Sequence, residues 1–107
     1  MDTLRAGISD VVNTLNKLMG NSTDPDEQEQ IQKVLRVLFM LWEEVIRQEI
    51  DSSTAKYKAA LDALSKAEKT AQDAIKDINK VADAIETAVK AAKAVDKIVK
   101  VVADVFA

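Results

Sequence analysis

Acidic side chains crowd the segment around the single proline of the chain. Asp24 precedes Pro25, and Asp26, Glu27 and Glu29 follow it. Clustered carboxylates can bind divalent cations or move protons, and their spacing decides between these roles and a purely structural one. The segment lacks the central glycine and the alternating ligands of a calcium-binding loop. We therefore interpret it as the cap and first turn of a helix, where the dipole favours negative charge, with Asp26, Glu27 and Glu29 forming an acidic surface.

The chain has no histidine and no cysteine among its 107 residues. Histidine is the usual general base near neutral pH, and both residue types supply most zinc sites and many nucleophiles. Gly7 and Gly20 are isolated, so a glycine-rich phosphate loop is excluded. The Glu-x-x-His pairs that hold metals in helical bundles are excluded as well. We therefore expect a protein that is not an enzyme and that uses no cofactor and no metal.

The distribution of charge bears on the class of partner. The formal net charge is −3, whereas nucleic-acid binding depends on a surplus of Lys and Arg, so we expect no nucleic-acid partner. Residues 24–50 hold seven acids and three bases, and residues 51–107 hold nine acids and ten lysines, which predicts an acidic end and a weakly basic end.

No run approaches the roughly 18 apolar residues of a membrane span, and the first residues lack the pattern of a signal peptide. The expected location is the cytoplasm, with export by a dedicated secretion system as the alternative.

Helical periodicity runs through most of the sequence. With 48% hydrophobic residues, two glycines and one proline, the composition favours an all-α fold in a single domain, 1–107. We predict helices at about 3–19, 25–50 and 54–106. The first shows apolar residues at helical spacing from Leu4 onward, with Asp2 or Thr3 as its N-cap and Gly20 at its C-terminal end.

The second predicted helix carries an unusually wide apolar stripe. Apolar residues are nearly continuous from Val34 to Trp42 and recur at Val45, Ile46 and Ile50. At about 100° per residue they cover more than half of the helix circumference, which predicts neighbours on at least two sides. The alternative is a surface groove for a partner, and Met40 lies furthest from the main stripe.

The stretch from Ser52 to Ala107 contains no glycine and no proline, and it predicts one long coiled-coil-like helix or two helices with an unmarked break. Apolar residues alternate at steps of three and four, with one charge, and shift phase once after Ala92. This predicted seam consists of Leu61, Leu64, Glu68, Ala71, Ile75, Ile78, Ala82, Ile85, Val89, Ala92, Val95, Val99, Val102 and Phe106.

The length of this helix decides between two architectures. Unbroken, it would extend about 80 Å, roughly twice the second helix, and would leave an apolar face exposed. We therefore predict an antiparallel helical hairpin or three-helix bundle whose long C-terminal helix pairs with another copy or another protein. A break near residues 77–80 would give a four-helix bundle instead.

The functional expectation is a non-catalytic protein–protein interaction module of the inhibitor, immunity, chaperone or adaptor type, acting on a protein partner or as a homo-oligomer. The Lys- and Ala-rich helices resemble those of secreted bacterial helical toxins and their partners in general composition, and no motif names a family. The predicted partner-binding residues are Ile75, Ile78, Ala82, Ile85, Val89, Ala92, Val95, Val99, Val102 and Phe106.

The alternative function is a membrane-active protein. Lys90, Lys93, Lys97 and Lys100 form a basic face opposite the apolar residues from Val95 to Phe106. A helix with this division of charged and apolar faces can lie on an anionic membrane surface.

Overall fold

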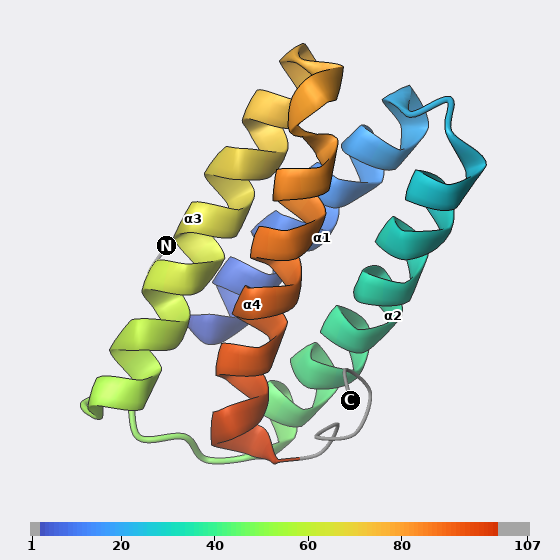
Figure 1. Ribbon diagram of the computed structural model, residues 1–107. Helices are drawn as coiled ribbons and strands as arrows, with labels where there is room; N and C mark the ends of the chain where they lie inside the picture. The colour runs from blue at the N-terminus through green and yellow to red at the C-terminus, as the bar shows by residue number, and fades with distance from the viewer. Residues whose placement is uncertain (1–2, 101–107) are drawn as a thin grey trace.

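The computed structural model describes residues 3–100, and helices account for most of them. The α-helices are α1 (Leu4–Asn21), α2 (Pro25–Arg47), α3 (Ala55–Lys76) and α4 (Val81–Val99), and a short 3-10 helix, η1 (Ile78–Lys80), joins α3 to α4 (Figure 1). The all-helical class expected from the sequence is confirmed, with four α-helices in one bundle.

Helices α1, α2 and α3 begin close to the predicted starts, each at a short polar side chain. The side chain of Thr3 accepts from the N–H of Ala6 at 3.1 Å, and that of Asp24 accepts from the N–H of Asp26 at 2.9 Å. Pro25 occupies the first turn of α2, where its missing N–H leaves no bond unmade. Thr54 caps α3 in the same way, accepting from the N–H of Tyr57 at 3.2 Å. Short polar side chains therefore set the starts of α1, α2 and α3.

The helix ends differ more from the prediction. Gly20 does not terminate α1, which continues to Asn21, and neither described glycine has a positive φ. The second helix ends at Arg47 rather than near Ile50. Residues 48–54 then form an irregular connection to α3 (Figure 1).

The single long helix predicted for residues 54–106 is wrong, because the chain breaks at Asp77. This residue is extended, with φ −141° and ψ 105°, and its own N–H still donates to the carbonyl of Asp73 at 3.0 Å. Its carboxylate accepts from the N–H of Asn79 at 3.0 Å, which caps the next turn. Asp77 thus ends α3 and starts η1, and the structure has the break near 77–80 that was the alternative. The predicted end at 106 lies outside the described residues.

The break lets α4 fold back along α3. Helix α1 contacts α2 and α3, and α4 contacts the same two helices, so α2 and α3 lie on one diagonal of the bundle. The 48–54 connection crosses that diagonal at one end (Figure 1). The bundle measures 39 × 25 × 19 Å, so its long dimension is close to the length of α2.

The core holds larger side chains on the side of α1 and α2 and more alanines on the side of α3 and α4. Helices α1 and α2 bury leucine, isoleucine and valine, with Leu15, Ile31 and Leu38 among the fully buried residues. The buried residues of α3 and α4 include eight alanines, whose small size allows helix axes to approach closely, beside larger residues such as Leu64 and Val95. These alanines are Ala60, Ala67, Ala71, Ala74, Ala84, Ala88, Ala91 and Ala92.

The predicted seam of α3 is rotated from the true one. The buried residues of this helix follow steps of three and four, at Tyr57, Ala60, Leu64, Ala67, Ala71 and Ala74. The predicted members Leu61, Glu68 and Ile75 are only half-buried and flank this face. Alanines, rather than the larger aliphatic residues beside them, therefore face the core.

The alanine contact can be tested with one enlarged side chain. Ala67→Leu should destabilise the fold by about 1–3 kcal/mol, because a larger side chain forces α3 away from its neighbours. Ala59→Leu, at an exposed position of the same helix, is the matched control and should change stability by less than about 0.5 kcal/mol. Urea unfolding followed by circular dichroism measures both. Equal stability of the two variants would contradict the close contact.

Candidate interaction surfaces

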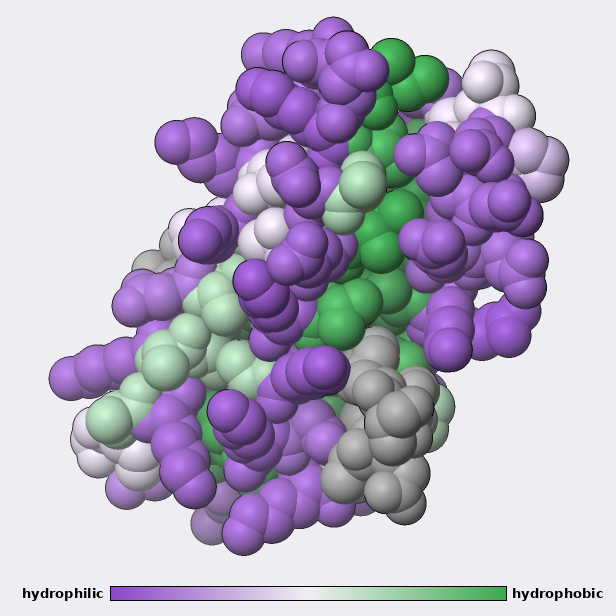
Figure 2. Space-filling view, in the orientation of Figure 1, coloured by the Kyte–Doolittle hydropathy of each residue, from purple (hydrophilic) through white to green (hydrophobic). Residues whose placement is uncertain are grey.

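An apolar groove runs between α2 and α4, two helices that are far apart in sequence. Val34 of α2 and Ile85 and Val89 of α4 form its apolar lining, and Gln30 and Lys33 of α2 complete it. Figure 2 shows a continuous band of apolar residues between the polar side chains of these two helices. We call these five residues the α2–α4 groove. Val34 and Ile85 are buried, whereas Val89 is half-buried at the rim.

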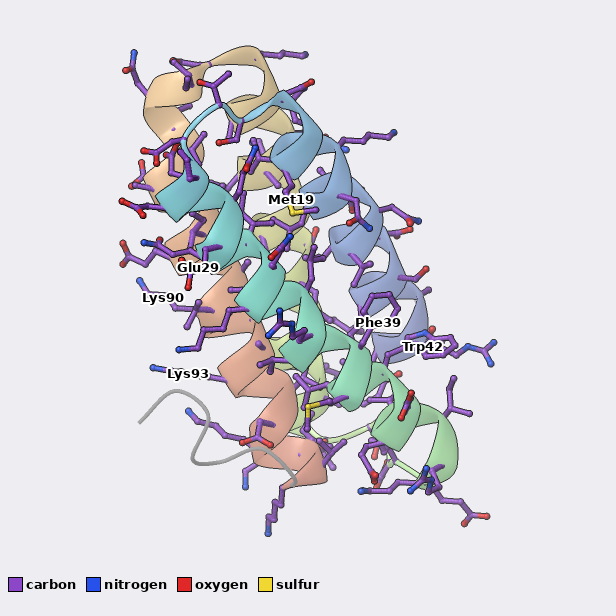
Figure 3. The ribbon with its side chains drawn as sticks, turned by 90° about the vertical axis from the view of Figure 1, so that its right-hand side faces the viewer. Met19, Glu29, Phe39, Trp42, Lys90 and Lys93 are labelled. Carbon is purple, nitrogen blue, oxygen red and sulfur yellow. The ribbon has the colours of Figure 1, made fainter. Side chains whose placement is uncertain are left out.

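Charged residues flank the groove on both sides. Lys33 lies on α2, and on α4 Lys90 pairs with Glu86 at 3.2 Å. Both members of this pair are largely exposed, so the pair contributes little to stability and its charges stay accessible. Figure 3 places Glu29 of α2 and Lys90 of α4 on the same side of the molecule. The apolar floor is therefore bordered by charges of both signs.

The acidic surface predicted from the sequence adjoins this groove. Asp26 and Glu29 are exposed, Glu27 is half-buried, and all three lie in the first turns of α2. Asp26 and Glu29 line a shallow depression together with Gln30 and Lys33, which also line the groove. These acids therefore lie in the first turns of α2 and also adjoin the α2–α4 groove.

The predicted basic face is exposed along α4. Lys90, Lys93, Lys97 and Lys100 all reach solvent. Lys97 and Lys100 line a depression that also includes Asp51 and other residues of the 48–54 connection. The opposite, apolar face of α4 is not exposed to solvent, because Val95 and Val99 are buried in the bundle.

The predicted partner-binding residues do not form one surface. Ile85, Ala92, Val95 and Val99 are buried against helices of the same chain, and Val102 and Phe106 lie outside the described residues. Ile75 and Val89 are half-buried, whereas Ile78 and Ala82 are exposed. The structure brings Ile85 and Val89 together at the α2–α4 groove and separates them from Ile78, at the tip of the α3–α4 hairpin.

The α2 residues of the groove were not among the predicted sites. Periodicity describes one helix at a time, so it does not show which helix lies opposite Val34. The wide apolar stripe of α2 was the available signal. It accounts for the exposed apolar residues of this helix, which are Phe39 at 52%, Met40 at 46% and Ile46 at 49%. Figure 3 shows that Phe39 and Trp42 lie on the α1 side of α2.

Within residues 3–100, no group of three or more acidic side chains is placed to hold a metal ion. None of the helices in that range is both long and apolar enough to cross a bilayer.

Comparisons of the chain with protein-family models, with curated proteins and with solved structures found no match.

The depression beside Lys97 and Lys100 allows a test of local electrostatics. The Ser53 hydroxyl, at 2.6 Å, and the Ser53 N–H, at 2.9 Å, both donate to the Asp51 carboxylate and lower its pKa. Ser53→Ala should raise the pKa of Asp51 towards its ordinary value, and Ser52→Ala, the neighbouring control, should not change it. Titration of the Asp51 carboxyl carbon by NMR measures both, and equal pKa values in all three proteins would contradict the assignment.

The lowered pKa of Asp51 determines how this residue makes the stability of the fold depend on pH. A carboxyl group with a lower pKa in the folded state stabilises the fold above its unfolded pKa. That contribution is lost as pH falls through the folded value. Because Asp51 is exposed, the effect on stability should be small.

Proposed function

We propose that this protein is a non-catalytic interaction module that binds an amphipathic helix of a protein partner in the α2–α4 groove. The observation that carries the proposal is an apolar groove between two helices with charged residues along its rims. Helix-in-groove recognition uses this arrangement, with apolar anchors at steps of three and four and polar flanks. An inhibitor, a chaperone and an adaptor would each use such a surface.

The groove suits a helix because of how its floor and rims differ. Val34 and Ile85 are buried and leave little exposed apolar area, but the half-buried Val89 offers a rim that an inserted side chain can cover. Burial of apolar area on both partners is favourable by about 25 cal/mol per Å² before the costs of association. Lys33, Glu86 and Lys90 supply both signs of charge, which favours a partner helix with mixed charges on its flanks.

The membrane-active alternative draws less support from the fold. Its apolar face begins at Val95 and Val99, which are buried among the helices of the bundle. Binding through this face would require α4 to detach, which would expose the alanine contact with α3. The four exposed lysines are also the expected solvated face of a bundle helix.

The proposal predicts that a charge in place of the half-buried, apolar Val89 weakens binding. Val89→Glu should lower capture of the partner from native lysate at least tenfold, because the partner's apolar anchor would face a buried carboxylate. Phe39→Glu is the matched control, since Phe39 is an exposed apolar residue on the opposite edge of α2. It should leave capture unchanged. Quantitative mass spectrometry of the captured proteins gives both ratios.

A photo-reactive residue at position 89 locates the contact. It should crosslink to a segment of the partner with apolar residues at helical spacing, whereas the same residue at Ala59, exposed on α3, should not. Circular dichroism confirms that each variant is folded. Capture that is equally strong for wild type and Val89→Glu would overturn the proposal, and so would crosslinking from Ala59 alone.

A further inference from the structure

The connection between α3 and α4 contains no residue that prevents a continuous helix. Four residues, Asp77 to Lys80, separate the two α-helices, and none is glycine or proline. Asp77 is extended, and Lys80 has φ −98° and ψ 1°, whereas Val81 is already helical. The 3-10 residues between them lie near helical dihedrals. Rotation of Asp77 and Lys80 would therefore join α3 and α4.

The tip of this hairpin exposes an apolar side chain without an evident role. Ile78 is 63% exposed, more than Phe39, Met40 or Ile46. In a continuous helix, Ile75, Ile78, Ala82 and Ile85 follow steps of three, four and three and form one stripe. The hairpin divides this stripe, so a straight helix would align residues that the closed form leaves apart.

The contacts of α4 can be remade by a second copy. Helix α4 packs on α3 and α2 through a face that includes Ala88, Ala91 and Val95. Since α3 and α4 are antiparallel neighbours, two straightened chains can lie side by side, running in opposite directions. Each chain then supplies α4 to the bundle of the other, and the two Ile78 side chains approach the two-fold axis between the bundles.

We propose that this chain forms a domain-swapped dimer in which α3, η1 and α4 become one helix, Ala55–Val99, and each α4 completes the bundle of the partner copy. Swapping preserves the contacts of the closed bundle, so the hinge and the concentration set the balance between forms. The dimer also buries Ile78, which the monomer does not. The α2–α4 groove persists in both forms and is lined by two chains in the dimer, so this proposal is independent of the partner proposed above.

Refolding at different concentrations tests the swap. Because α4 must leave its own bundle, exchange should be slow in native buffer, and refolding from urea should allow either form. Light scattering behind gel filtration should show monomer after refolding at low protein concentration. A fraction with twice the monomer mass should appear after refolding at high concentration, and it should convert to monomer slowly after dilution.

Ile78→Pro separates the hairpin from the straight helix. Ile78 is the first residue of η1 and follows the extended Asp77, and proline is tolerated at such a position. Inside a continuous helix the same proline is strongly unfavourable, so the dimer association constant should fall at least about a hundredfold. Ile78→Ser is the control, because it removes the apolar side chain without preventing a helix. It should reduce dimerisation less than Ile78→Pro does.

A double variant that removes the Asp77 cap should have the opposite effect and favour the continuous helix. Asp77→Ala combined with Asn79→Ala deletes the carboxylate that accepts from the N–H of residue 79 and adds two strong helix formers. The dimer fraction should rise. Monomer alone, from both wild type and this variant after refolding at high concentration, would overturn the proposal. A dimer that forms equally well with Ile78→Pro would also overturn it.

Discussion

The close contact between α3 and α4 depends on the alanines that both helices bury. Ala67, Ala71 and Ala88 are fully buried, and their small size lets the two helices approach closely enough to share one core with α1 and α2. Two features of the bundle follow from this approach. It sets the position of α4 beside α2, and therefore the width of the α2–α4 groove. It also places the hinge at the tip of the bundle, where Ile78 is exposed.

The starts of the helices were predictable because they depend on local chemistry. Thr3, Asp24 and Thr54 cap helices by accepting from backbone N–H groups two or three residues ahead, and such spacing is visible in the sequence. The break at Asp77 is also a cap, but no glycine or proline accompanies it. Helix propensity favours a straight chain there, and the Asp77 cap together with the burial of the apolar face of α4 against α2 and α3 reverses that preference.

The rotation of the seam has a related cause. Periodicity selected Leu61 and Ile75, which are larger than the alanines beside them, yet Ala60 and Ala74 face the core. Large apolar residues at the edge of a closely packed contact remain half-buried, so their size does not identify the contact face. The α2–α4 groove could not be predicted from periodicity, because it lies between two helices that are paired only by the fold. The acidic surface and the lysine face were local features, and all of their residues except the half-buried Glu27 are exposed.

The central claim is that residues 55–99 form a hairpin that closes one bundle. Lys56 and Lys97 line the same depression, so both ends of the hairpin meet at one end of the molecule. Since the chain has no cysteine, Lys56→Cys with Lys97→Cys gives two unique sites for spin labels, in protein refolded at low concentration and diluted with unlabelled chains. Pulsed electron paramagnetic resonance should give a single short distance. A distance near 60 Å, the length of a continuous helix between these residues, would contradict the closed bundle.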